Sequence, residues 1–217
     1  MNVDRRGAWF MAKLNKVATA VSAVFGDRAY LYVVGSATYK TNPRDLDLLV
    51  VVKRPRGGAL ARFYRLAEAI GGVKIGANYC SADRLIGEWD TWVGLIDVER
   101  LGETPPVLLR TWRENYIAIR GPPLDALIPP VRITLEDVVY GMYGVKYCED
   151  VLTNNRAYEA VLEGDSFVRR KVVLSEEQRR FFVDYCRKWI RRNLAAVGEL
   201  QSGVLQNLST TQLPRVI

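Results

Sequence analysis

The run Leu46 to Val52, LDLLVVV, constrains the fold more than any other part of the chain. A short stretch of leucine and valine with one acidic residue predicts a β-strand that apolar groups cover on both faces. Such strands belong to sheets with helices on both sides, rather than to sheets with one face in water. We therefore expect an α/β domain whose central sheet contains this run.

The segments around this strand alternate between helical and extended patterns. Trp9 to Phe25 carries apolar residues at helical spacing, and Tyr30 to Val34 is rich in aromatic and β-branched residues. Further helices are predicted at 59–70, 83–89 and 106–112, and further strands at 73–80, 93–98 and 116–119. This order predicts an α/β (α+β) fold with a mixed sheet flanked by helices.

The pair Pro129-Pro130 is the strongest boundary signal in the chain. Beyond it the patterns are helical. Thr134 and Asp137 are suited to cap one helix, and Ser175 to Gln178 have the pattern of a capping box for another. We predict a first domain over residues 1–128 and a helical C-terminal domain over residues 131–217.

Histidine and cysteine usage excludes several kinds of chemistry. The 217 residues include no histidine, which removes the usual general base near neutral pH and any Ser/His or Cys/His mechanism. Cys80, Cys148 and Cys186 have no metal-ligand spacing and form no even disulfide set, so we interpret them as small core residues in a reducing compartment. Catalysis would then depend on carboxylates, a metal ion or positioning.

The charge and the hydropathy pattern narrow the partners and the location. A net charge of +7, from 31 basic and 24 acidic residues, suits a polyanionic partner such as a nucleotide or a nucleic acid. No apolar run is long enough to span a membrane, and the first residues lack the apolar segment of a signal peptide. We therefore expect a cytoplasmic protein that does not enter a membrane.

Two short motifs flank the first strand-to-strand connection. Gly35-Ser36 follows the strand that ends at Val34, where Gly35 permits close backbone approach and the Ser36 hydroxyl with nearby amides can bind phosphate. Asp45 and Asp47 open the next strand and point away from its core face, about 7 Å apart. Two such carboxylates suit Mg²⁺, whose remaining ligands are water and phosphate oxygens. The two motifs together predict a metal and nucleotide site.

Gly-Ser, a short loop and Asp-x-Asp on the next strand resemble the signature of the DNA polymerase β-like nucleotidyltransferase superfamily. The order of the later segments is loosely similar to that of aminoglycoside adenylyltransferases. The resemblance implies that residues 1–128 form a nucleotidyltransferase domain. It also implies that Gly35 and Ser36 bind a nucleoside triphosphate, and that Asp45 and Asp47 ligate catalytic Mg²⁺ or Mn²⁺.

The reaction that this resemblance implies is attack by an acceptor hydroxyl on the α-phosphate of a nucleoside triphosphate, with pyrophosphate leaving. AMP from ATP is the expected nucleotidyl group. The acceptor would be a small molecule, a protein or RNA, and a second copy of the chain, in a homo-oligomer, is a further candidate partner. Lys40 and Arg44, in the loop between the motifs, are candidate phosphate ligands, with plain solvation as the alternative for both.

The superfamily also places a third carboxylate on the strand after the Asp-x-Asp motif. The strand predicted at 73–80 contains no acid, and Asn78 cannot take up a proton at neutral pH. Asp97, on the next predicted strand, is the candidate that remains. The alternatives to an active transferase are an impaired module that binds nucleotide, RNA or a protein partner, as an antitoxin does, and an oligomeric structural protein.

Overall fold

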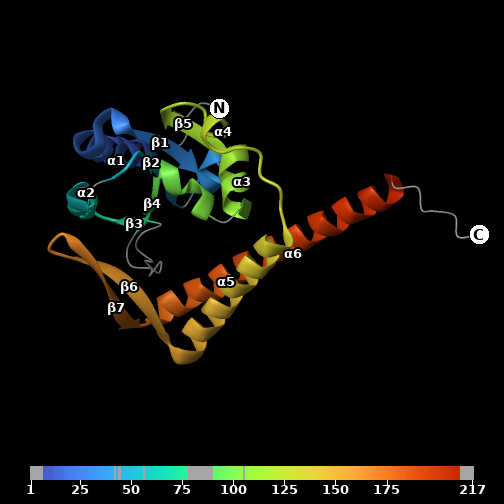
Figure 1. The fold of residues 1–217 in the computed structure, drawn as a ribbon. Coiled ribbons are helices and arrows are strands. Elements are labelled where there is room, and N and C mark those ends of the chain that lie inside the picture. Colours follow the sequence, from blue (N-terminus) through green and yellow to red (C-terminus); the bar gives the residue numbers. More distant parts are fainter. Residues whose placement is uncertain are drawn as a thin grey trace, which may run out of the picture.

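The computed structural model describes residues 7–41, 43, 45–55, 57–77, 90–104 and 106–210. Its first part is a mixed sheet with helices on both faces (Figure 1). The strands are β1 (Ala29–Val34), β2 (Leu46–Val52), β3 (Val73–Ala77), β4 (Thr91–Asp97) and β5 (Tyr116–Arg120). Their spatial order is β3-β4-β2-β1-β5. The predicted α/β (α+β) fold with a mixed sheet is confirmed.

Strand β1 lies in the middle of the antiparallel half of this sheet. It pairs antiparallel with β2, from Ala29 opposite Val52 to Val34 opposite Asp47, and antiparallel with β5 on its other side. Strand β2 pairs parallel with β4, which pairs parallel with β3. The chain reaches the parallel half through α2 (Gly57–Ile70), as parallel neighbours require a crossover.

Strand β2 is covered on both faces, as its apolar run predicts. Leu46, Leu48 and Val50 are fully buried against α1 (Ala8–Phe25) and α2. Leu49 and Val51 are buried on the other face, against η4 (Val98–Glu103), α3 (Pro106–Glu114) and α4 (Leu124–Leu127). Short 3-10 turns, η2 (Gly26–Arg28) and η3 (Gly35–Thr38), lie before and after β1.

The strand predicted at 73–80 begins as expected, but its residues after Ala77 lie outside the described part, as does the helix predicted at 83–89. No helix among the described residues combines the length and apolar composition that crossing a membrane requires.

The C-terminal part contains two long helices, α5 (Leu135–Asn154) and α6 (Glu176–Thr210), and both predicted capping boxes are present. The expectation of a purely helical region is wrong, because an antiparallel hairpin of β6 (Arg156–Glu163) and β7 (Ser166–Val173) joins these helices. Charged residues interrupt its apolar ones without a strict two-residue alternation, and Gly164, with φ of 61°, lies in the turn. Without that alternation the sequence carries no clear strand signal over these residues.

Ion pairs connect the C-terminal part to helices on both faces of the sheet. Arg65 of α2 donates to the Gly164 carbonyl (2.7 Å) and to the Asp165 carboxylate (2.9 Å) at the hairpin turn. Arg110 of α3 pairs with Glu199 of α6. Figure 1 shows α6 continuing beyond the start of α5 and away from the sheet. The division into domains 1–128 and 131–217 remains a prediction, with Pro129-Pro130 in the extended segment before α5.

Helices α5 and α6 pack closely because α5 carries glycine at the contact. A β-carbon on Gly144 would lie 2.7 Å from the ring of Trp189, which is buried in the core of this helix pair. A β-carbon on Gly141 would overlap the side-chain oxygen of Asn193. Small residues at these positions therefore fix how near the two helices approach.

We expect Gly144→Ala to destabilise the protein by about 1–3 kcal/mol, because the Trp189 ring must shift out of a packed site. Gly198→Ala is the matched control, since a β-carbon there meets nothing within 4 Å. That control should be neutral or stabilising by up to about 1 kcal/mol through helix propensity. Urea unfolding midpoints measure both effects, and equal midpoints for the two variants would contradict the packing argument.

Candidate functional site

The two sequence motifs meet at one end of the β1–β2 pair. Val34, the last residue of β1, is paired with Asp47, and Gly35 follows with φ of 71°. A β-carbon on Gly35 would overlap the Asp47 carboxylate. The Gly35 backbone and the Asp47 side chain are therefore in direct contact, and only glycine combines this φ with this approach.

The turn that follows Gly35 is braced by its own hydrogen bonds. The Ser36 carbonyl accepts from the backbone N–H groups of Tyr39 (3.4 Å) and Lys40 (2.9 Å), and the Thr38 hydroxyl donates to the Gly35 carbonyl (2.8 Å). Ser36 is half-buried and the Lys40 side chain is exposed. Arg44, the other candidate phosphate ligand, lies outside the described residues.

The two aspartates lie at the same end of the sheet. Asp47 is half-buried. Its neighbours Leu46 and Leu48 point to the opposite face of the sheet, into the core that α1 covers. Asp45 is also half-buried and directly precedes β2. Both carboxylates are thus attached to a fully packed strand, while neither is sealed inside the protein.

Aromatic residues flank the Val34–Asp47 pair on the two outer neighbouring strands. Trp92 of β4 is in register with Asp47, and Tyr116 of β5 is in register with Val34. The Trp92 ring lies against Gly94, whose missing side chain leaves space for it. A row Trp92–Asp47–Val34–Tyr116 therefore crosses the sheet beside the Gly35 turn.

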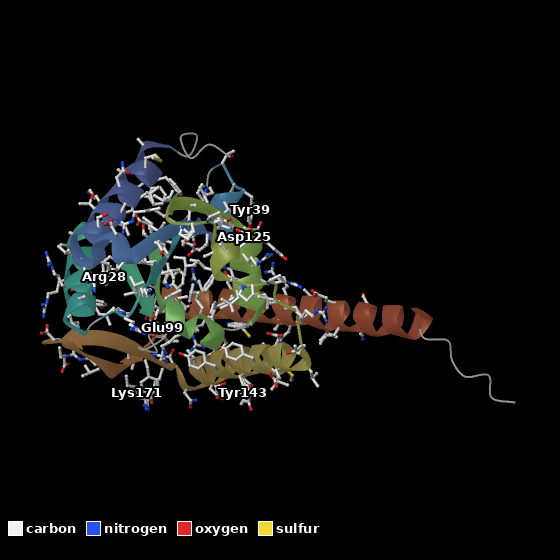
Figure 2. All side chains as sticks on the ribbon, turned by 45° about the horizontal axis from the view of Figure 1, so that its top comes forward. Arg28, Tyr39, Glu99, Asp125, Tyr143 and Lys171 are labelled. Carbon is white, nitrogen blue, oxygen red and sulfur yellow. The ribbon has the colours of Figure 1, made fainter. Side chains whose placement is uncertain are left out.

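Tyr116 extends this row to α4. Its hydroxyl donates to the Asp125 carboxylate (2.9 Å). Burial raises the pKa of the Tyr116 hydroxyl, and the hydrogen bond to Asp125 and the charge of Asp125 raise it further. Figure 2 shows Asp125 and Tyr39, the residue after η3, at the same end of the domain, with Arg28 far from them. Neither Tyr116 nor Asp125 was predicted from the sequence.

Asp97 does not lie near the two aspartates. Strand β4 runs parallel to β2, and Asp97 pairs with Val52 at the opposite end of both strands. Its carboxylate accepts from the backbone N–H groups of Glu99 (3.1 Å) and Arg54 (3.4 Å) and so caps η4. In Figure 2 Glu99 lies well away from Tyr39. The expectation that Asp97 completes the site is wrong. Asp97 belongs to the strand beside Asp47, but the parallel register of β2 and β4 places it at the far end of the sheet.

Asp90, directly before β4, is an acid that the sequence analysis missed. Its carbonyl accepts from the Leu46 N–H (2.9 Å), which places its backbone beside the start of β2. Its carboxylate accepts from the Trp9 indole (3.1 Å) and the Thr91 hydroxyl (2.8 Å), and pairs with Lys13 (3.0 Å). The sequence signal that could have found Asp90 is its place directly before a strand, which it shares with Asp45.

The ionisation of Asp90 is tied to these partners. Burial raises its pKa, but the hydrogen bonds from Thr91, Lys13 and Trp9 and the charge of Lys13 outweigh burial and hold the pKa below its usual value. This carboxylate therefore anchors helix α1 to the end of the sheet at which β2 begins.

Because the pKa of Asp90 is lower in the folded protein, its carboxylate stabilises the fold at pH values above the unfolded pKa of about 4. This stabilisation is lost as the pH falls through the folded pKa. Asp90→Asn should therefore lower the free energy of unfolding above pH 4, with a smaller difference from the natural protein in more acidic solution. We expect at most about 1 kcal/mol, because this carboxylate is partly exposed. Denaturant midpoints from pH 3 to 6 test this, and a difference independent of pH would contradict it.

The acidic side chains at this end of the sheet are the candidate ligands of a metal ion. In residues 7–41, 43, 45–55, 57–77, 90–104 and 106–210, no three histidine, cysteine or acidic side chains are grouped to hold a metal. Asp45 and Asp47 provide hard carboxylate oxygens from alternate positions of one chain segment. That pair fits Mg²⁺ or Mn²⁺, which take one or two carboxylates and complete their coordination with water and phosphate.

Comparison with known proteins finds likenesses among solved structures. No family model matches the sequence, and no curated protein matches it. The solved structures that match include spectinomycin adenyltransferase AAD(9) from Enterococcus faecialis, crystallised with ATP and spectinomycin. The identity is 15%, the match covers 66% of this chain and 68% of that chain, and the TM-score is 0.45. A TM-score at this level supports no inference about function.

Proposed function

We propose that this protein is a metal-dependent nucleotidyltransferase that transfers a nucleotidyl group, AMP from ATP in the first instance, to a hydroxyl acceptor. The observation that carries the proposal is the contact of Gly35 with the Asp47 carboxylate at the Val34–Asp47 pair. It brings a turn suited to phosphate and a carboxylate suited to a hard cation to one point.

Each residue of the motifs has a defined task in this proposal. Asp45 and Asp47 hold the divalent cation, which supplies charge neutralisation at the phosphates of the bound nucleotide. Gly35 lets the triphosphate approach the backbone, and the Ser36 hydroxyl donates to a phosphate oxygen. Lys40, exposed at the end of the same turn, adds positive charge near the outer phosphates.

The reaction is a substitution at the α-phosphorus. A bond forms between the acceptor oxygen and the α-phosphorus, and the bond to the bridging oxygen of the β-phosphate breaks, so that pyrophosphate leaves. The acceptor proton passes to a base on the acceptor or to water. The site residues act by holding the reactants in line and by stabilising negative charge, which makes a histidine base unnecessary.

The test is to incubate the purified chain with Mg²⁺ and each nucleoside triphosphate labelled at the α-phosphate. The acceptors are pooled hydroxyl compounds, RNA and the protein itself. We expect pyrophosphate release with label on one acceptor class, loss of both on chelation, and recovery when Mg²⁺ is restored. Triphosphate binding without any turnover would overturn the transferase and favour a nucleotide-binding module. No triphosphate binding would overturn both.

A further inference from the structure

Two of the three cysteines face each other across the α5–α6 contact. Cys148 of α5 is fully buried in the core of the helix pair, and Cys186 of α6 is half-buried and packs against that core. The Cys186 side chain lies near enough to Cys148 to raise the pKa of its thiol. Although the sequence separates these residues by about 40 positions, the helix packing brings both into one apolar cluster.

The register of the two helices explains why these residues meet. Gly141 lies against Asn193 and Gly144 lies against Trp189, so a step forward along α5 matches a step back along α6. One further turn of each helix brings Cys148 opposite Cys186. The glycines also let the helices approach closely, as a disulfide requires of the two α-carbons, which must lie within about 7 Å.

We propose that Cys148 and Cys186 form an intramolecular disulfide that staples α5 to α6 under oxidising conditions. The staple covalently joins the helices that precede and follow the β6–β7 hairpin. It therefore makes the packing of the C-terminal part dependent on redox state.

The oxidant is a small-molecule disulfide such as oxidised glutathione. The half-buried Cys186 thiol loses its proton and attacks that disulfide, which releases one glutathione thiol and leaves a mixed disulfide. The Cys148 thiol then loses its proton and displaces the second glutathione. Two protein thiols are oxidised by two electrons, and one glutathione disulfide is reduced to two thiols.

The environment of Cys148 predicts how fast this bond forms. Burial, with smaller contributions from Cys186, raises the pKa of the Cys148 thiol to about 12. A buried thiol with so high a pKa yields little thiolate near neutral pH. The second step should therefore be the slow one, and it should accelerate as the pH rises.

The first test uses the natural chain, incubated for hours at pH 8–9 with oxidised glutathione. The protein is then unfolded with its free thiols blocked, digested without reduction and analysed by mass spectrometry. We expect a linked peptide pair that contains Cys148 and Cys186, with both thiols lost from the free pool, whereas Cys80 stays a thiol or carries glutathione. Three free thiols after oxidation, stable glutathione adducts on Cys148 or Cys186, or a protein disulfide that involves Cys80 would each overturn the proposal.

The second test measures stability. Closing a loop of this length should raise the thermal midpoint of the oxidised chain by roughly 5–15 °C, and a reductant should reverse the shift. Cys80→Ser is the matched control and should retain the shift, whereas Cys186→Ser should abolish it. An oxidised chain that carries the linked peptide and melts at the temperature of the reduced chain would contradict the staple.

Discussion

Replacing Asp45 and Asp47 by asparagine should lower the rate of nucleotidyl transfer by roughly 100- to 1,000-fold for each single change. Asparagine keeps the size of the side chain and removes the negative charge that holds the cation. Both residues are half-buried at the sheet end, so the fold should persist. Label transfer at saturating Mg²⁺ and triphosphate measures the loss, and circular dichroism checks the fold.

The matched control for these variants is Asp97→Asn. Asp97 lies on β4 at the end opposite Asp47, where its carboxylate caps η4, and asparagine is also a good cap. We expect this control to retain transfer activity. If the double variant Asp45→Asn with Asp47→Asn transferred label as fast as the natural chain, the metal role of these aspartates would be disproved.

Gly35→Ala should remove activity as completely as loss of either aspartate, for a different reason. The added β-carbon would overlap the Asp47 carboxylate and must displace it from the site. The positive φ of Gly35 adds backbone strain of about 1–2 kcal/mol for any other residue. The variant should therefore lose label transfer and unfold at a lower urea concentration.

Gly71→Ala separates these two effects. Gly71 has φ of 74°, close to the 71° of Gly35, but a β-carbon there meets nothing within 4 Å. Gly71→Ala should therefore unfold at a lower urea concentration than the natural chain and keep its transfer activity. Equal loss of transfer in both variants would show that strain, rather than contact with Asp47, explains the effect of Gly35→Ala.

The strands and helices of the first part could be predicted where one segment carries its own pattern. Strand β2 was predicted at its observed bounds because the run Leu46–Val52 is apolar throughout except at Asp47. Both capping boxes were likewise visible, since a cap joins residues three positions apart. The meeting of Gly35 with Asp47 followed from two adjacent strands and a short connection.

The neighbours of β2 could not be predicted, because sheet order depends on packing between distant segments. The chain forms β3 before β4, yet β4 lies beside β2. Asp97 was chosen from its place in the sequence, whereas the parallel register sends it to the far end of the sheet. The hydrogen bond of Trp9 to Asp90 and the approach of Cys148 and Cys186 within one cluster depend in the same way on helix packing.

The position of Trp92 has an optical consequence. Its indole is half-buried and in register with Asp47, so it lies on the strand beside the carboxylate proposed to hold the cation. Indole fluorescence responds to nearby charge and to changes in hydration. Binding of a triphosphate with its cation would change the charge and the hydration near this ring. The difference between the spectra of the natural chain and of Trp92→Phe isolates the Trp92 signal. The protein thus carries a built-in fluorophore at the point where its substrate is proposed to bind.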